Sequence, residues 1–236
     1  QLLRTINISM IAIDECHCVS QWGHDFRPSY RTIQPLIKSL TDRPVISAFT
    51  ATATKEVKDD VVKLLGLKNS KVYTTGFDRK NLFFSVVRGE NKKDYLVKYI
   101  EDNKDQVGII YAATRKEVDS IYELLKGKGY AVSKYHAGLN DSERSKAQED
   151  FIYDNVNIIV ATNAFGMGID KSNVRYVIHY SIPKNMEAYY QEAGRAGRDG
   201  EASQCVLLFG AQDIMLQKFL IEQSTSLEER RLMEYR

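Results

Sequence analysis

The chain has 236 residues, 43% of them hydrophobic, which is enough for one large or two modest domains that each bury an apolar core. Its 33 Lys and Arg residues nearly balance 31 Asp and Glu residues, which leaves a net charge of only +2. Overall charge therefore does not indicate a polyanionic partner, and any affinity for nucleic acid must come from the local placement of cations. Three cysteines, no apolar run of membrane-spanning length and no signal-peptide pattern predict an intracellular protein without a membrane partner, in the cytoplasm or nucleoid, or in the nucleus of a eukaryote.

Short apolar runs alternate with helical patterns from the start of the chain. The first runs with the length and composition of strands are residues 8–13, 45–49 and 71–75. A helix is predicted between the last two because four apolar residues share one helical face: Val57, Val61, Leu64 and Leu65. Thr54 is its expected N-cap, and Gly66 lies just past its end. Because the chain begins without Met and almost at once enters a strand, we expect it to be a fragment of a longer protein.

The alternation continues after residue 76. Six further strands are predicted at residues 82–87, 107–111, 131–135, 158–161, 174–179 and 206–209. Asn140 and Glu143 form a capping-box pattern for a helix that ends near Tyr153. Strands that alternate with helices are typical of a parallel sheet covered on both faces. We therefore predict an α/β fold with an incomplete first lobe, a complete second lobe and a short helical extension, spanning residues 1–76, 77–210 and 211–236.

Asp14 and Glu15 directly follow the first predicted strand. The carboxyl ends of parallel strands are where open α/β sheets bind ligands. One carboxylate there can hold Mg²⁺ on nucleotide phosphates while its neighbour polarises an attacking water, as phosphoryl transfer requires. Two acids at a strand end are on their own more often a solvated turn, so the surrounding motifs decide the interpretation.

Two other groups of residues have side chains suited to nucleotides or nucleic acids. Arg195 and Arg198 lie three positions apart among small residues, so one turn would present both guanidiniums to a polyphosphate; a solvated Gly-Arg loop is the alternative. Trp22, Phe26 and Arg27 place two aromatic rings and a cation in one loop, where single-stranded bases would stack for about 1–3 kcal/mol each. Packing of the rings beneath the loop is the alternative, and for Phe26 it is equally favoured.

Four motifs occur in a characteristic order. They are DECH at residues 14–17 followed by CVSQWGHDFRP, SAFTATAT at 47–54, ATNAFGMGIDK at 161–171, and QEAGRAGRDG at 191–200. In order and identity they resemble the RecQ family of superfamily 2 DNA helicases, from about residue 8 to residue 209. The resemblance implies two RecA-like lobes of a motor that hydrolyses ATP with Mg²⁺, moves 3′ to 5′ on single-stranded DNA and separates duplexes in DNA repair and recombination.

The resemblance also implies roles for residues near the first strand. Asp14 would position Mg²⁺, Glu15 would be the general base, and His17 would link them to the coupling segment Thr50, Ala51 and Thr52. The loop with Trp22, His24, Phe26 and Arg27 would bind single-stranded DNA. Cys16 stands where the family usually has Ala, a change that we expect to be tolerated. Zinc binding by Cys16, His17 and Cys18 is disfavoured because consecutive residues cannot easily close a tetrahedron.

Further roles follow for the second lobe. Arg198 resembles the arginine finger and Arg195 a second phosphate or sensor contact, with Gln191 at the nucleotide in the same motif. Asp170 would contact the ribose, and Thr162 the DNA backbone and the nucleotide cleft. Arg115 matches a position near the DNA backbone, although a helix-capping or salt-bridge role is equally compatible with its place.

The chain contains no G-x-x-x-x-G-K-[ST] phosphate loop. The resemblance places that loop upstream of Gln1 and a zinc-binding module downstream, so we expect zinc only there and no ATP hydrolysis by the 236 residues alone. Two rival functions remain. A DEAD-box-like RNA helicase is disfavoured by the DExH form and the aromatic loop, and a non-catalytic nucleic-acid-binding module is disfavoured by the intact Glu15 and Arg198.

Overall fold

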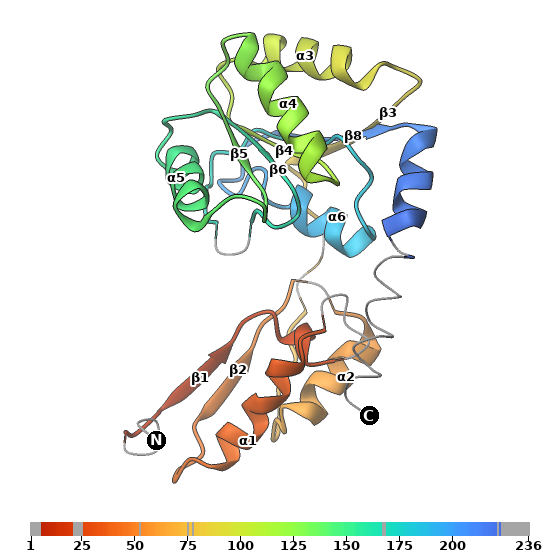
Figure 1. Ribbon diagram of the computed structural model, residues 1–236. Coiled ribbons are helices and arrows are strands. Elements are labelled where there is room, and N and C mark those ends of the chain that lie inside the picture. The colour runs from red at the N-terminus through yellow and green to blue at the C-terminus, as the bar shows by residue number, and fades with distance from the viewer. Residues whose placement is uncertain are drawn as a thin grey trace. The chain divides into compact units, whose positions relative to one another are not determined.

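The computed structural model describes residues 6–20, 26–51, 53–74, 76, 78–166, 169–220 and 222. The chain divides into two compact units, residues 1–77 and 78–236, each with its own sheet (Figure 1). All strand pairs in both sheets are parallel, and helices intervene between most successive strands. The predicted α/β class is therefore confirmed.

The first unit has a two-stranded sheet, in which β1 (Met10–Ile13) pairs with β2 (Val45–Ala48). Its helical elements are η2 (Cys16–Val19), η3 (Pro28–Thr32), α1 (Ile33–Lys38) and α2 (Lys55–Leu64). The Thr54 side chain accepts a hydrogen bond from the Val57 N–H, and Gly66 follows α2 with a φ of 64°. The predicted cap and helix end are thus confirmed. The core of the unit packs β1 and η2 on α2, through Ile13, Cys16, Val19, Val57, Val61 and Leu65.

The predicted strand at residues 71–75 is wrong for the residues that the structure describes there, 71–74. Their backbone is not in a ladder, and Val72 and Tyr73 are 61% and 84% exposed. A strand needs a hydrogen-bonded neighbour, and among the described residues β1 and β2 pair only with each other, so this segment joins no ladder. Residue type favoured a strand, but pairing decides whether one forms.

The second unit has a six-stranded sheet in the order β3-β8-β7-β4-β6-β5. Its strands are β3 (Leu82–Arg88), β4 (Gly108–Tyr111), β5 (Val132–Tyr135), β6 (Ile158–Ala161), β7 (Tyr176–His179) and β8 (Ser203–Phe209). Each coincides with a predicted strand to within three residues. Since all pairs are parallel, every carboxyl end lies at the same edge of the sheet, where α/β proteins bind ligands.

Helices cover both faces of this sheet (Figure 1). They are α3 (Lys92–Asp102), α4 (Arg115–Gly127), α5 (Asp141–Ile152) and α6 (Met186–Ala193), and residues 211–220 are also helical. One buried cluster joins the sheet to α3 and α4, and another joins it to α5 and the end of α6. Successive strand residues alternate between the clusters, as with Ile109 in one and Ile110 in the other, because strand side chains point to opposite faces.

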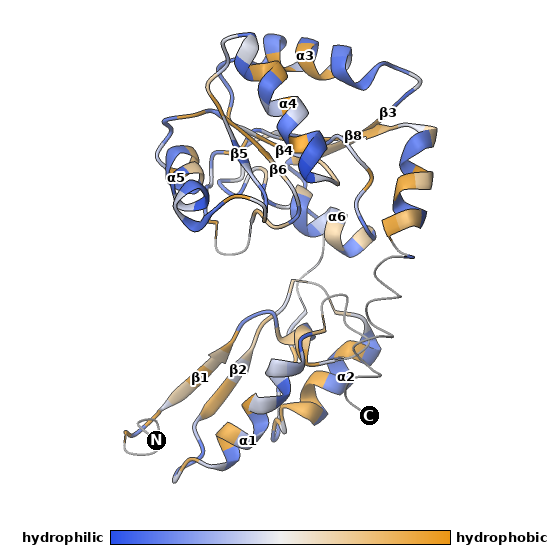
Figure 2. Cartoon of the chain, viewed as in Figure 1, coloured by the Kyte–Doolittle hydropathy of each residue, from blue (hydrophilic) through white to orange (hydrophobic). Residues whose placement is uncertain are grey.

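The helices carry the hydropathy pattern expected of such layers. Figure 2 shows hydrophobic and hydrophilic residues side by side along α3 and α4, whose apolar residues pack on the sheet. The predicted capping box of Asn140 and Glu143 is confirmed at the start of α5, which ends at Ile152. No helix in the described part of the chain is long and apolar enough to cross a membrane.

Gly108 in β4 supports a prediction about stability. It lies opposite Tyr176 of β7, and a Cβ on Gly108 would lie 1.9 Å from the fully buried Tyr176 ring. We expect Gly108→Ala to lower the free energy of unfolding of the chain by about 1–3 kcal/mol, because neither strand can move away. Urea unfolding followed by circular dichroism measures this loss.

Gly127→Ala is the matched control, because Gly127 ends α4 and a Cβ there would meet nothing within 4 Å. It is expected to raise the free energy of unfolding by up to about 1 kcal/mol. Equal effects of the two substitutions would contradict the close packing of β4 against β7.

Candidate functional site

The acidic pair lies in the turn that follows β1. Asp14 is exposed, Glu15 is half-buried, and the Glu15 N–H donates to Asp14 Oδ1 at 2.8 Å. Beyond the strand ends, the Phe49 N–H donates to Ile13 O at 2.8 Å and the Cys16 N–H to Phe49 O at 2.9 Å. The sheet hydrogen bonding therefore continues past β1 and β2 and holds the turn that carries both acids.

Glu15 has an unusual backbone conformation. Its φ of 46° and ψ of 42° are left-handed, a region that costs a non-glycine residue roughly 1–2 kcal/mol. Such strain persists only where the surroundings impose it, and it is common at functional sites. Here the turn brings the Glu15 carboxylate back towards His17.

His17 joins the acidic turn to the end of β2. Its side chain is 2% exposed, and Nδ1 lies 2.8 Å from Thr50 Oγ1 and 3.3 Å from Glu15 Oε2. One imidazole nitrogen thus contacts both the predicted base and the first residue of the predicted coupling segment. Ala51 is exposed beside Thr50, and Thr52 lies outside the described residues. The coupling role of these residues stays a prediction.

The cysteines near the acidic turn are buried. Burial raises the pKa of the Cys16 thiol to about 11, which keeps it protonated. Cys18 is fully buried, with Sγ 3.7 Å from His17 Nε2. Metals bind thiolates rather than thiols. Within the described ranges, no three His, Cys, Asp or Glu side chains gather as ligands of a metal ion.

The structure describes part of the predicted DNA-binding loop. Trp22 and His24 lie outside the described residues. Phe26 is half-buried, with the Arg31 guanidinium carbon 5.0 Å from its ring centre, and the Arg27 N–H donates to Cys18 O at 2.9 Å. The end of the loop is therefore bonded to the segment that directly follows the acids, and DNA binding by Phe26 and Arg27 stays a prediction.

Thr162 and Arg115 lie at the carboxyl edge of the second sheet. Thr162 follows β6 and is 8% exposed, and its N–H donates to Tyr135 O at 3.1 Å. Arg115 is exposed in the first turn of α4. The alternative of helix capping by Arg115 is wrong, because Thr114 is the N-cap and forms a capping box with Glu117.

The two arginine positions are held in different ways. The Arg195 guanidinium donates to Gly166 O, and it lies so close to Gly166 that a Cβ there would be 2.2 Å from Arg195 Cζ. Arg198 donates to Ile169 O at 3.2 Å and to Asp170 Oδ1 at 3.1 Å. The segments 161–171 and 191–200 are therefore in contact through both arginines.

The exposure of these side chains differs too. The Arg198 and Asp170 side chains are 38% and 89% exposed, whereas Arg195 is half-buried and Gln191 lies half-buried within α6. Arg198 is thus open to a ligand, while the Arg195 guanidinium supports the loop at Gly166. The nucleotide contacts of all four residues stay predictions.

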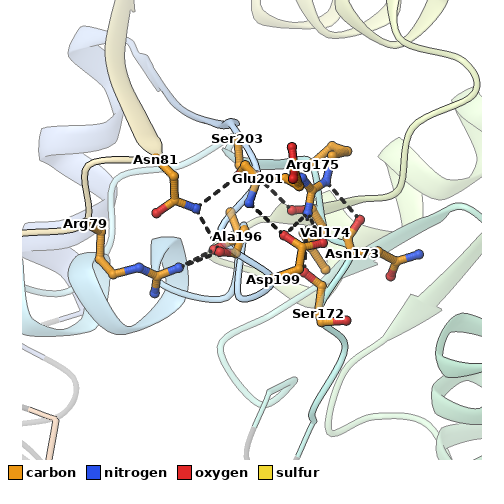
Figure 3. Close-up of polar contacts among 11 residues, drawn as sticks. Arg79, Asn81, Ser172, Asn173, Val174, Arg175, Ala196, Asp199, Glu201 and Ser203 are labelled. Atoms are coloured by element: carbon orange, nitrogen blue, oxygen red, sulfur yellow. Dashed lines mark hydrogen bonds and ion pairs between the residues drawn. The ribbon is translucent and has the colours of Figure 1, made fainter.

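The sequence did not indicate the polar contacts that surround the Arg198 turn (Figure 3). Arg79 and Asn81 donate from one side, and an Arg175–Asp199 ion pair lies on the other, with its closest nitrogen–oxygen distance at 2.6 Å. Hydrogen bonding from Arg175 lowers the pKa of Asp199. No local pattern marks Arg79 or Asn81, because their partners are more than a hundred residues away in the sequence.

A buried His179–Glu192 pair was also missed. His179 Nε2 lies 2.9 Å from Glu192 Oε2, and the side chains are 1% and 11% exposed. The pair attaches α6 to the end of β7, beside a cavity of about 270 Å³ that opens at the carboxyl ends of β4 and β7. The buried contact between His179 and Glu192 thus attaches α6, the helix that precedes Arg195 and Arg198, to the sheet.

Two family models match the chain. One, described as DEAD/DEAH box helicase, covers residues 2–60, and the other, described as helicase conserved C-terminal domain, covers residues 91–200. The solved structure of S. cerevisiae Dbp5 L327V bound to RNA and ADP BeF3 is similar with a TM-score of 0.70 at 22% identity, over 92% of this chain and 57% of that chain. The two units therefore have the parallel-sheet fold of RecA-like helicase domains.

Comparison with individual relatives identifies the family of helicases to which the chain belongs. The ATP-dependent DNA helicase RecQ of Bacillus subtilis is 56% identical over 98% of this chain, and that of Haemophilus influenzae is 44% identical over 94%. The chain belongs to the RecQ family, which confirms the resemblance seen in its motifs. It spans 39% and 36% of the lengths of these two relatives.

Proposed function

We propose that the chain is part of an ATP-dependent DNA helicase that moves 3′ to 5′ on single-stranded DNA and separates duplexes during DNA repair and recombination, in the cytoplasm or nucleoid, or in the nucleus of a eukaryote. Residues 1–76 would belong to its first lobe, residues 77–210 would form the second, and residues 211–236 would lead to a zinc-binding module. The observation that carries the proposal is the His17 contact with both Glu15 and Thr50, since it connects a predicted base to a second strand end.

The acidic turn fits Mg²⁺-ATP. Mg²⁺ is usually held by one or two carboxylates together with substrate phosphates and water, and Asp14 offers an exposed carboxylate at a strand end. When bound, Mg²⁺ would neutralise developing phosphate charge. Glu15 would accept the proton of the attacking water, and His17 would hold the carboxylate of Glu15 in place.

The second unit would supply cations and the remaining nucleotide contacts. Arg198 would act as the arginine finger, supported by its exposure and its position in a held turn. Asp170, Gln191 and Arg195 would surround the nucleotide. DNA would bind through the loop residues Trp22, His24, Phe26 and Arg27 and through Arg115 and Thr162 at the sheet edge.

Nucleotide hydrolysis by the full-length protein tests this proposal. We expect single-stranded DNA to stimulate ATP hydrolysis, RNA to stimulate it weakly, and duplexes with a 3′ tail to be unwound. The 236-residue chain alone is the control and is expected to hydrolyse no ATP, because the acids would have no held phosphate to act on. Stimulation by RNA alone would support an RNA helicase instead, and full-length protein without ATPase activity would indicate a binding module.

A further inference from the structure

We propose that Arg79 and Asn81 are positioning residues that set the conformation of the turn at residues 194–201 and thereby place Arg198. The inference rests on the proposed function of Arg198 as the arginine finger. Figure 3 shows Arg79 and Asn81 pointing into this turn from the segment that precedes β3.

Arg79 binds a backbone carbonyl at the C-cap of α6 and two more in the turn that follows the helix. The guanidinium donates to the oxygens of Gly194 at 3.3 Å, Ala196 at 3.1 Å and Gly197 at 2.8 Å. The last carbonyls of a helix lack partners within it and carry partial negative charge, so the cation beside the C-cap residue Gly194 is favourable. A planar guanidinium with five N–H donors can bind three oxygens together, which a lysine ammonium cannot reproduce with the same geometry.

Asn81 joins the middle of the turn to its end. Its Nδ2 donates to Gly197 O at 2.8 Å and to Glu201 O at 2.9 Å. Gly197 has a φ of 57°, and a Cβ there would lie 2.4 Å from Asn81 Nδ2. The backbone of Asn81 is itself fixed, because its carbonyl accepts from the Ser203 N–H at 2.9 Å. The turn and the Asn81 side chain therefore fit closely.

The opposite side of the turn is held by Arg175. Its guanidinium binds both Asp199 carboxylate oxygens, at 2.6 and 2.7 Å, and the carbonyls of Ser172 and Asn173 (Figure 3). Arg198 thus lies between Gly197 and Asp199, which are both bonded to other parts of the unit. The backbone position of Arg198 is fixed by neighbours, while its side chain stays partly exposed.

Arg79 also has a distinctive place in the sequence. The division between the two compact units falls after residue 77, so Arg79 is the second residue of the second unit. The first residues of the second unit are therefore bonded directly to the turn that carries Arg198. A displacement of residues 79–81 would shift the turn through the three hydrogen bonds of Arg79.

Steady-state ATPase kinetics of the full-length protein test the proposal. Arg79→Ala is expected to lower kcat by about 10- to 100-fold, because a displacement of about 1 Å at a catalytic group can cost that much. The KM for ATP and the affinity for single-stranded DNA should stay within about twofold of wild type. Arg79→Lys should retain part of the lost activity, and Asn81→Ala should show a smaller loss of kcat.

Lys92→Ala is the matched control. Like Arg79, Lys92 binds a backbone carbonyl and is partly buried, with Nζ 2.6 Å from Tyr180 O and 2.7 Å from Asp213. It lies at the start of α3, and its loss should lower the thermal unfolding temperature without lowering kcat. If the Lys92 and Arg79 variants lost kcat equally, general destabilisation of the unit would explain the effect of Arg79→Ala. That result would overturn the proposal.

A double-mutant cycle separates positioning from an independent role. If Arg79 acts through Arg198, adding Arg79→Ala to Arg198→Ala should change the single-turnover hydrolysis rate by less than about twofold. If the rate loss of the double variant equalled the product of the losses in the two single variants, the proposal would be overturned. An unchanged kcat in all the Arg79 and Asn81 variants would overturn it as well. Wild-type protein without ATPase activity would instead contradict the proposed function itself.

Discussion

Arg198→Ala is expected to lower kcat for ATP hydrolysis by the full-length protein by about 10³- to 10⁵-fold, the range of an arginine finger. The physical reason is that a guanidinium stabilises charge on the transferring phosphoryl group more than it stabilises bound ATP. The KM for ATP should therefore change little. The protein should still fold, because the Arg198–Asp170 pair is exposed and such pairs contribute about 0–1 kcal/mol. Single-turnover hydrolysis with labelled ATP measures the loss.

Arg144 provides a closely matched control for Arg198. It is an arginine of α5 with a side chain 35% exposed, and its partner Asp141 is 92% exposed, compared with 38% and 89% for Arg198 and Asp170. Arg144→Ala removes an equally exposed ion pair and should leave kcat unchanged. Arg198→Lys should stay strongly impaired, because an ammonium lacks the forked donors of a guanidinium. If Arg198→Ala hydrolysed ATP with the kcat of the wild type, Arg198 would not be the arginine finger of the proposed mechanism.

The parts of the fold that were predictable from the sequence depend on local rules. Thr54 and Asn140 cap helices through side-chain bonds to residues three positions later, so their patterns can be read within one turn of chain. The strands β4, β6 and β7 are buried on both faces and appear as continuous apolar runs. The four motifs likewise lie in continuous segments, which is why the acids and arginines could be identified before their surroundings were known.

The parts that were not predictable depend on partners far away in the sequence. Residues 71–74 have strand composition, yet they form no ladder, because a pairing partner rather than composition decides. Arg79 bonds to carbonyls 115 to 118 residues away, and those carbonyls belong to the backbone, which has no residue-type signature. The left-handed conformation of Glu15 has the same origin, since the turn is imposed by hydrogen bonds between the ends of two strands.

Glu15→Gln is the second substitution with a large expected effect. Glutamine keeps the size and shape of the side chain near His17 but cannot accept a proton from water, so kcat for ATP hydrolysis by the full-length protein should fall by about 10²- to 10⁴-fold. Binding of ATP and single-stranded DNA should remain, because neither requires a proton acceptor. Rapid-quench hydrolysis assays, together with fluorescence titrations of both ligands, measure the two properties separately.

Glu15→Gly distinguishes catalysis from structure at the same position. Glycine adopts a φ of 46° without strain, so relief of roughly 1–2 kcal/mol should offset its greater flexibility in the unfolded chain. The thermal unfolding temperature should thus equal or exceed that of wild type, while hydrolysis should be as slow as in Glu15→Gln. Asn69→Gly is the control, because Asn69 is exposed and also left-handed, with a φ of 50°, and its replacement should leave kcat unchanged. Substantial hydrolysis by both Glu15 variants would assign the proton acceptor to another group and leave the strained turn with a structural role only.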